Sequence, residues 1–189
     1  MDEPRERRRR LFAGIELDET ARSACAAAAQ SLQRTGFIAK YEAPEKLHVT
    51  LAFLGYVDPD RVAAVQEALA ATASRFAPFA VGLDKLGAFP HERRPRVVFV
   101  GSRAQGAAFR TLAAGLRDAY RELGFRFEDD AVVHVTIARV KESKRPLPLV
   151  DFAAIQMPVQ SLALFESLPN PANRTTRYET IAKSSLNGR

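Results

Sequence analysis

The sequence contains one pentapeptide twice, as His48-Val49-Thr50-Leu51-Ala52 and as His134-Val135-Thr136-Ile137-Ala138. The two copies differ only in the exchange of leucine for isoleucine, and together they hold two of the three histidines in the chain. Each copy has the pattern of a buried strand, with histidine and threonine on one face and aliphatic residues on the other. The repeat therefore predicts a single site between two similar halves.

Strand alternation predicts which side chains share a face with the histidines. We expect His48, Thr50 and Ala52 to lie on one face of the first strand, and Phe53 to lie on the other face with the aliphatic residues. The second copy repeats this pattern. Alanine is small, so it would leave room beside each imidazole.

The spacing of the motifs indicates an internal duplication. Leu11 precedes His48 by 37 residues, and Val97 precedes His134 by the same 37 residues. Both spans predict a strand, a helix, a short strand and then the motif strand. The expected fold is α+β, with two pseudo-twofold-related lobes whose antiparallel sheets face a central cleft. We expect one bilobal domain over residues 10–183, with duplicated halves at about 10–95 and 96–183 and strands exchanged between the lobes.

Periodicity, caps and chain breakers predict the other elements. Helices are expected at about 18–33, 61–74 and 106–123. Strands are expected at 11–15, 37–41, 47–54, 79–86, 96–100, 125–127, 131–140, 155–165 and 177–183. Residues 1–9 are expected to form a basic N-terminal tail, and residues 184–189 a C-terminal tail.

Composition indicates a soluble globular protein of the reducing cytoplasm. The net charge of +6 and the pI of about 9.8 favour a polyanionic partner, although a generally basic enzyme has the same charge. Cys25 is the only cysteine, so no intramolecular disulfide is possible, and its Ala-rich helix predicts a buried apolar role. No stretch is long and apolar enough for a signal peptide or a membrane span.

The two histidines suggest paired proton transfer. Imidazole titrates near pH ~6.5, so a protonated His48 and a neutral His134, or the reverse, can act together as general acid and general base. The hydroxyls of Thr50 and Thr136 can donate hydrogen bonds to phosphate oxygens. One His-x-Thr copy alone would favour a satisfied core pair, but two matching copies favour function. A zinc site is poorly supported, because the strands place no Asp or Glu two or four residues from either histidine.

The paired motifs resemble those of the 2H phosphoesterase superfamily. The residues that carry the resemblance are His48–Gly55 (HVTLAFLG) and His134–Arg139 (HVTIAR), with Arg10–Leu17 and Arg174–Tyr178 similar to the opening and closing strands. The similarity is greatest to the RNA 2′,3′-cyclic phosphodiesterases, also called LigT-like 2′-5′ RNA ligases. This family usually has proline immediately before the second histidine, where this chain has Val133, and we expect a local backbone shift there without loss of activity.

The resemblance implies metal-independent hydrolysis of terminal 2′,3′-cyclic phosphate to a 2′-phosphate, without a cofactor. It implies that His48 protonates the departing 3′ oxygen and that His134 accepts the proton of the attacking water. The expected partners are RNA with 2′,3′-cyclic phosphate ends or small cyclic nucleotides, with no membrane and no obligate protein partner, so a monomer is expected. Two alternatives stay open: reversible 2′-5′ RNA ligation at the same site, and a non-catalytic RNA-end-binding module.

Further residues are proposed as substrate contacts. Arg139 ends the second motif strand and is proposed to contact RNA, with a surface ion pair as the alternative; Tyr178 is proposed to stack on a base. Phe89 could also stack on a base, although packing in the core is favoured for it. Two basic loops, one at Arg93, Arg94 and Arg96 and one at Lys141, Lys144 and Arg145, are further candidates for backbone contacts. His91 is assigned no catalytic role.

Overall fold

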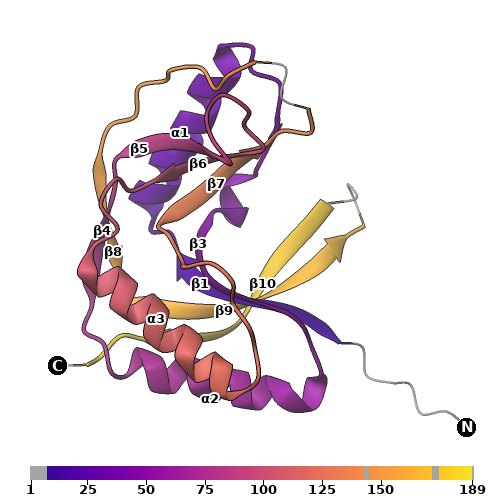
Figure 1. The fold of residues 1–189 in the computed structure, drawn as a ribbon, viewed down its shortest axis with the longest axis vertical. Helices are drawn as coiled ribbons and strands as arrows, with labels where there is room; N and C mark the ends of the chain where they lie inside the picture. The colour runs from indigo at the N-terminus through magenta and orange to yellow at the C-terminus, as the bar shows by residue number, and fades with distance from the viewer. Residues whose placement is uncertain (1–7, 143–144, 172–174, 189) are drawn as a thin grey trace, which may run out of the picture.

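The computed structural model describes residues 8–142, 145–171 and 175–188. Its main sheet has eight antiparallel strands, seven of them in the order β10-β9-β1-β3-β7-β6-β5, and β2 pairs with β7 beside this path (Figure 1). A separate two-stranded sheet pairs β4 with β8. The strands are β1 (Arg9–Glu16), β2 (Lys40–Tyr41), β3 (His48–Val57), β4 (Phe79–Leu83), β5 (Lys85–Phe89), β6 (Val97–Gly101), β7 (His134–Arg139), β8 (Ile155–Val159), β9 (Ser161–Asn170) and β10 (Thr175–Ser185).

Three α-helices cover the sheets. They are α1 (Glu19–Arg34), α2 (Val62–Ala73) and α3 (Ala107–Glu122), and single 3₁₀ turns lie at Pro44–Lys46 and Pro59–Arg61. The helix α1 begins where predicted, because the Asp18 carboxylate accepts a hydrogen bond from the Ala21 amide at 2.9 Å. The fully buried Cys25 lies on the inner face of this helix, as predicted, and burial raises the pKa of its thiol to about 12.

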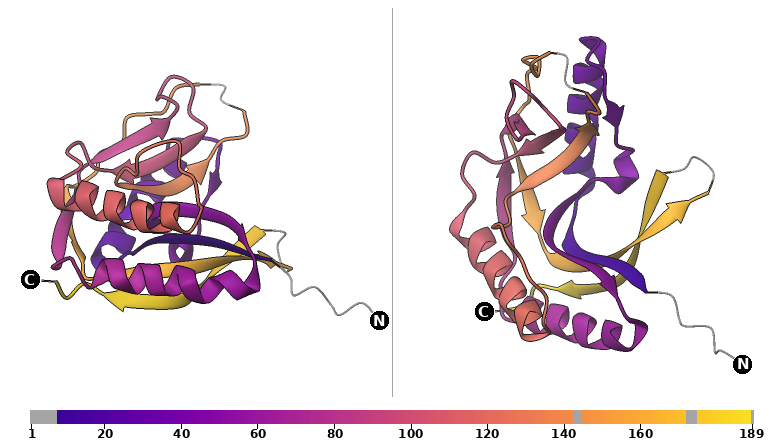
Figure 2. Two further views of the ribbon diagram at one scale, coloured as in Figure 1. Left: turned by 60° about the horizontal axis from the view of Figure 1, so that its bottom comes forward. Right: turned by 45° about the vertical axis from the view of Figure 1, so that its right-hand side comes forward.

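The sheet divides into two lobes that meet at the repeated motif. The first lobe contains β1, β3, β9 and β10, with α2 and α3 side by side on its outer face (Figure 2). The second lobe contains β2, β5, β6 and β7, with α1 packed against β7. The motif strands β3 and β7 pair only at Val49 and Val135, which occupy the same position in the two pentapeptides. Matching residues that face each other across antiparallel strands have a local twofold relation.

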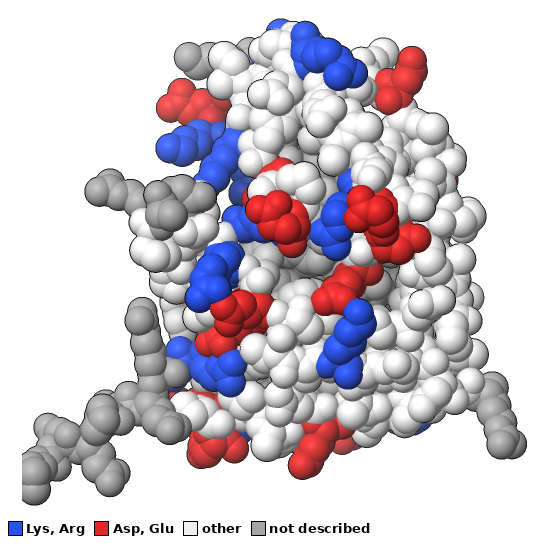
Figure 3. All heavy atoms as spheres, turned by 180° about the vertical axis from the view of Figure 1, so that it is seen from behind, with Lys and Arg blue, Asp and Glu red and all other residues white. Residues whose placement is uncertain are grey.

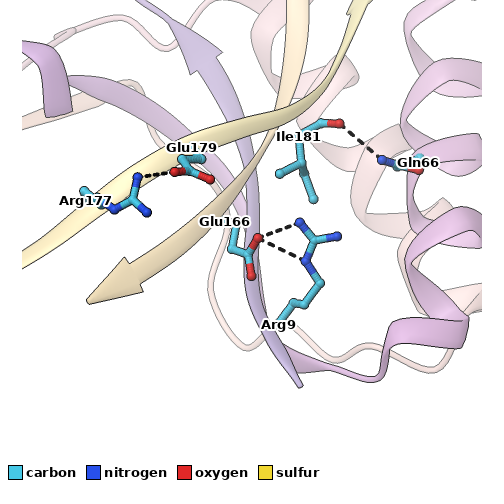
Figure 4. Close-up of polar contacts among 6 residues, drawn as sticks. All are labelled: Arg9, Gln66, Glu166, Arg177, Glu179 and Ile181. Atoms are coloured by element: carbon cyan, nitrogen blue, oxygen red, sulfur yellow. Dashed lines mark hydrogen bonds and ion pairs between the residues drawn. The ribbon is translucent and has the colours of Figure 1, made fainter. Parts of the chain in front are cut away.

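Each lobe contains segments from both parts of the sequence. The strand β5 pairs with β6, β9 pairs with β1, and α3 packs against α2 and β3. On this basis we propose the division into exchanged halves at about 10–95 and 96–183. Polar contacts stabilise the first lobe (Figure 4). The guanidinium of Arg9 on β1 donates to the carboxylate of Glu166 on β9, and the side-chain amide of Gln66 on α2 donates to the carbonyl of Ile181 on β10 at 3.3 Å.

Matching bulges in the two motif strands correct the predicted faces. Residues 13 and 14 of β1 lie opposite residues 52 and 50 of β3, so Leu51 is an extra residue. Residues 98 and 99 of β6 lie opposite residues 138 and 136 of β7, so Ile137 is the extra residue there. Each bulge shifts the alternation by one residue. Ala52 is therefore fully buried and Phe53 is exposed, the reverse of the prediction.

Other differences from the predicted elements concern strands. Residues 125–127 form no strand, and the segments predicted at 79–86 and 155–165 each divide between the two sheets. The C-terminal residues are not a free tail: β10 continues to Ser185, the Leu186 amide donates to the Gln160 carbonyl at 2.8 Å, and the Leu186 side chain is buried. At the other end β1 already includes Arg9, and residues 1–7 of the predicted tail lie outside the described residues. No helix among the described residues is long and apolar enough to cross a membrane.

Candidate active site

A cavity of about 920 Å³ lies between the two lobes. Its lining includes His48 and Thr50 from β3 and His134 and Thr136 from β7, so the structure brings the four motif side chains into one site. The cavity also reaches Arg139 and Tyr178, the two proposed RNA contacts. The twofold relation at the crossing of β3 and β7 explains this convergence, because it turns the polar faces of both motif strands towards the same space.

The backbone fixes the tautomer of His48. Its Nδ1 lies 2.7 Å from the carbonyl oxygen of Lys46. A carbonyl oxygen only accepts hydrogen bonds, so Nδ1 must carry the proton in the neutral ring. The Nε2 atom lies 3.1 Å from the hydroxyl oxygen of Thr50, which can donate to it. The neutral ring therefore presents the Nε2 lone pair, and the protonated ring presents an Nε2–H.

His134 is held in the same way. Its Nδ1 lies 3.0 Å from the carbonyl oxygen of Val132, again the residue two positions earlier in the chain. The predicted proton-transfer residues therefore share one geometry, in which Nδ1 is bound to the backbone and Nε2 is left for chemistry. Two such nitrogens in one cavity can donate one proton and accept another.

Aromatic rings support each imidazole. Around His48, the rings of Phe12, Phe165 and Tyr178 have centroids at 4.8, 5.6 and 5.2 Å, with Tyr178 edge-on. Phe12 is almost fully buried and stacks on Phe165 at 4.9 Å. These rings restrict the orientation of the imidazole and dehydrate it. The contact with His48 gives Tyr178 a packing role in addition to its proposed role in binding RNA.

The second imidazole has its own pair of rings. The ring centroids of Phe89 and Phe99 lie 5.4 and 5.9 Å from that of His134, and the two phenylalanines stack at 4.5 Å. Phe89 lines the cavity and is partly exposed, so it does not belong to the core as predicted. Phe12, Phe99 and Phe165 are site residues that the sequence did not predict. The signal that could have found the first two is their place in the strands preceding each motif.

Burial makes both histidines weaker bases. It lowers the pKa of His48 and the pKa of His134 below the usual value for histidine. In each ring the hydrogen bond from Nδ1 to the backbone carbonyl opposes this effect, and the positive charge of Arg139 adds to it. Two contributions act on His48 alone: the charge of His134 lowers its pKa, and the smaller effect of the Glu42 carboxylate raises it.

Glu42 lies beside the site, although the residues around it in the sequence did not predict this position. Its Oε1 accepts from Nε of Arg139 at 2.9 Å, and its Oε2 lies 3.6 Å from Nζ of Lys46. The carboxylate is largely buried, with 12% of its side chain exposed. Its backbone amide donates to the carbonyl of Ile137 at 2.9 Å, which anchors Glu42 beside the second motif strand. Arg139 is thus both an ion-pair partner and a cavity residue.

The predicted basic loops lie outside this cavity. Arg94, Arg96 and His91 border a separate hollow of about 320 Å³, and Arg93 and Lys141 line neither. His91 is exposed and accepts from the Arg94 amide at 3.2 Å. Lys144 lies outside the described residues, as does Arg174 of the closing motif. Among the residues that the structure describes, no three His, Cys, Asp or Glu side chains are grouped so that they could hold a metal ion.

Comparison with known proteins decides the family. The family model described as LigT like Phosphoesterase matches two consecutive stretches of the sequence, residues 15–99 and 100–173. The chain belongs to this family. The predicted membership of the LigT-like phosphoesterases is therefore confirmed, and the two matches contain one His-x-Thr motif each.

Relatives of the LigT-like chain cover most of its length. An RNA 2′,3′-cyclic phosphodiesterase of Thermus thermophilus is 35% identical over an alignment 190 positions long, which covers 95% of this chain and 91% of the relative. One from Archaeoglobus fulgidus is 35% identical over 132 residues, covering 70% and 73% of the two chains. A crystal structure of a Thermus thermophilus protein has a TM-score of 0.78 at 30% identity, covering 95% of this chain and 99% of that chain. Escherichia coli LigT in apo form has a TM-score of 0.75 at 24% identity, with 96% and 99% covered. These similarities confirm the predicted α+β phosphoesterase fold.

Proposed function

We propose that the protein is an RNA 2′,3′-cyclic phosphodiesterase, which opens the terminal cyclic phosphate of RNA or of a nucleotide to a 2′-phosphate. The observation that carries the proposal is the matching pair of imidazoles in one cavity, each with Nδ1 held by a backbone carbonyl, so that proton transfer falls to Nε2. Relatives of this name at 35% identity support it. Binding alone does not require two proton-transfer groups, so the pair favours an enzyme over an RNA-end-binding module.

The geometry suggests an in-line displacement at phosphorus. Nε2 of neutral His134 accepts a proton from water while the water oxygen forms a bond to phosphorus. The bond from phosphorus to the 3′ oxygen breaks, and protonated His48 donates its Nε2 proton to that oxygen. The products are a 2′-phosphate and a 3′-hydroxyl. The reaction leaves a proton on Nε2 of His134 and none on Nε2 of His48, and exchange with solvent restores the starting state.

The threonines and Glu42 are assigned supporting parts. Thr50 and Thr136 donate hydrogen bonds to the non-bridging phosphate oxygens, whose charge develops during displacement. Glu42 favours the protonated form of His48 and makes no such contribution at His134. A neutral His134, as the proposed reaction requires, does not oppose the effect of Glu42, which is therefore consistent with His48 as donor. The assignment of His48 as donor and His134 as acceptor itself rests on the family resemblance.

Turnover of nucleoside 2′,3′-cyclic phosphates in EDTA tests the proposal. We expect His48→Ala and His134→Ala each to lower kcat by about 10²- to 10⁴-fold, the usual contribution of general acid–base catalysis. His91→Ala is the matched control, because His91 lies in an exposed loop outside the main cavity. Full activity of either motif variant would refute the acid–base assignment, and activity that EDTA abolishes and a divalent ion restores would support metal-dependent chemistry instead.

The product separates this reaction from its alternatives. Phosphorus NMR should show a 2′-phosphate, and a 3′-phosphate would mean that the other oxygen departs. 2′-5′ ligation would use the same groups in the same roles, with the 5′-hydroxyl of a second RNA in the position of the water, and cleavage of the 2′-5′ bond would reverse the two proton transfers. Joined RNA in the presence of 5′-hydroxyl ends would support that activity. Tight binding of cyclic ends without any turnover would support the RNA-end-binding module.

A further inference from the structure

The cavity continues past His48 along β3 as an exposed aromatic strip. Phe53 has 64% of its surface exposed and Tyr56 has 68%, and both line the cavity. Contiguous exposed apolar surface is a frequent mark of a binding groove. The strip is therefore a candidate binding surface, and its chemistry indicates which ligand fits.

Two bulges place these rings on one face. The first, at Leu51, brings Phe53 onto the side of Thr50. The second falls at Leu54, because residues 11 and 12 of β1 lie opposite residues 55 and 53 of β3. Gly55 has a φ of +71°, a left-handed conformation that glycine adopts without strain. In a regular strand, residues three apart would point to opposite faces. The backbone is thus shaped to present both rings to the cavity.

The steps along the strip are regular. Thr50, Phe53 and Tyr56 lie opposite residues 14, 12 and 10 of β1, so each step spans two residues of that strand. Two strand residues cover about 7 Å. This step is close to the repeat of an extended single nucleic-acid strand. A phosphate at Thr50 would therefore leave one base near Phe53 and the next near Tyr56.

A cation accompanies the outer ring. Arg10 lines the cavity directly opposite Tyr56, and its guanidinium lies 3.4 Å from the Ser167 hydroxyl. No carboxylate pairs with Arg10 among the described residues. The neighbouring carboxylate of Glu166 is instead held by Arg9, whose Nε lies 3.0 Å away (Figure 4). The strip thus combines two aromatic faces with an unneutralised positive charge.

Among the described residues, neither the other side of the cavity nor the face seen in Figure 3 has this combination. On the other side of the cavity, Arg139 occupies the position equivalent to Phe53, and Glu42 neutralises it. On the face seen in Figure 3, lysine and arginine are interspersed with aspartate and glutamate, so that face offers no broad field of one sign. Stacking rings with an accompanying arginine are the usual means of binding single-stranded nucleic acid.

We infer that Arg10, Phe53 and Tyr56 form a binding strip for the nucleotides that precede the cyclic phosphate in a single-stranded RNA. The inference rests on the proposed function. A 2′,3′-cyclic phosphate is the 3′ terminus of its strand, so the rest of the RNA leaves the site only in the 5′ direction. The last base before the terminal nucleotide stacks on Phe53, the base before it stacks on Tyr56, and Arg10 contacts a phosphate between them. RNA ends, rather than mononucleotides, are then the preferred substrate.

Comparing substrates of different length tests the strip. The substrates are cytidine 2′,3′-cyclic phosphate and a tetranucleotide that ends in the same group. We expect Tyr56→Ala to lower kcat/KM for the tetranucleotide about 5- to 150-fold more than for the mononucleotide, the range for loss of one stacked base. Arg10→Gln should weaken the salt dependence of the tetranucleotide reaction by about 0.7 in the slope of log kcat/KM against log salt. The matched control is Ile38→Ala, because Ile38 is an exposed apolar residue outside the cavity. This variant should change neither the ratio of kcat/KM between the two substrates nor the salt dependence.

The outcomes separate the strip from the proposed activity. An equal loss on both substrates would overturn the strip, because it would place Tyr56 in the site of the terminal nucleotide. A wild-type protein that turns over neither substrate would overturn the proposed function. In that case fluorescence anisotropy with a labelled tetranucleotide ending in a 3′-phosphate tests whether the strip binds RNA. The strip is supported if Tyr56→Ala weakens binding of this tetranucleotide and Ile38→Ala does not. Equal binding by wild type and Tyr56→Ala would overturn it, and would point to a protein partner for the exposed rings.

Discussion

Removing the motif hydroxyls one at a time tests whether the two threonines act as a pair. Valine replaces threonine with nearly the same shape, so Thr50→Val and Thr136→Val remove a hydrogen-bond donor without opening a space. Thr50 is largely buried and its Oγ1 lies 3.1 Å from Nε2 of His48, whereas Thr136 is partly exposed in the cavity. Neither change should lower the free energy of unfolding, because each exchanges a hydroxyl in a largely apolar strand for a methyl group.

The magnitude follows from the charge of the expected partner. A hydrogen bond to a charged group contributes about 1.5–3 kcal/mol. At 1.4 kcal/mol for each factor of ten, each variant should lose about 10- to 150-fold in kcat/KM. If Thr50 and Thr136 hold different phosphate oxygens, the two losses multiply in the double variant. If both hold the same oxygen, the double variant loses less than the product.

The assay is steady-state turnover of a nucleoside 2′,3′-cyclic phosphate, with urea unfolding of every variant as a check on stability. Thr111→Val is the control, since Thr111 lies on the exposed side of α3 and its hydroxyl donates to the Ala107 carbonyl at 3.0 Å. Losses below threefold in both motif variants would refute the role assigned to the hydroxyls. If a variant loses as much free energy of unfolding as it loses in transition-state stabilisation, the threonine hydroxyl stabilises the strand and has no separate role in the reaction.

Three further predictions concern charge, packing and a buried hydroxyl. Glu42→Gln removes the anion that raises the pKa of His48, so the fall in kcat/KM at high pH, where the donor loses its proton, should move to lower pH in the pH–rate profile. Gly14→Ala should lower the free energy of unfolding by about 1–3 kcal/mol in urea, because the new Cβ would lie 2.5 Å from the Val49 carbonyl oxygen. Tyr120→Phe should raise it by about 1 kcal/mol or more by calorimetry, because the buried Tyr120 hydroxyl has no hydrogen-bond partner among the described residues.

Each of these predictions has a contrary outcome. Glu45→Gln, at an exposed position three residues away, should leave the pH profile unchanged, and an equal shift in both variants would show only a general charge effect. Gly82→Ala is the control for the glycine variant, since its new Cβ would make contacts of 3.4 Å or more. If Gly14→Ala is as stable as the wild type, β1 and β3 can move apart at this point without lowering the free energy of unfolding. A less stable Tyr120→Phe would mean that the hydroxyl has a partner, such as water.

Much of the fold was predictable because it depends on local patterns. The cap at Asp18 and the glycine at the end of α1 mark that helix in the sequence alone, and the structure places its first residue at Glu19. Both motif strands form where the apolar pattern indicated. The strand predicted at residues 125–127 is absent because no neighbouring strand pairs with it, which is a property of the sheet and not of the segment.

The faces of the motif strands were predicted only as far as the bulges. His48 and Thr50 share the cavity face because they precede the extra residue. Phe53 follows it, and so the rule of strict alternation assigned Phe53 to the wrong side. A bulge arises from the register with the partner strand, which a short stretch of sequence does not contain. For the same reason the sequence did not show that the segments at 79–86 and 155–165 each divide between the main sheet and the β4–β8 pair.

The sequence by itself indicated which groups we propose for the chemistry: two histidines and two threonines, in two strands with matching motifs. Only the tertiary structure decided how they differ. Glu42, which is distant in the sequence from its partner Arg139, lies beside one end of the site and breaks the symmetry between His48 and His134. Charge effects act through space over a few ångströms, so the histidines of two nearly identical pentapeptides acquire different proton affinities only when the folded chain gives them different neighbours.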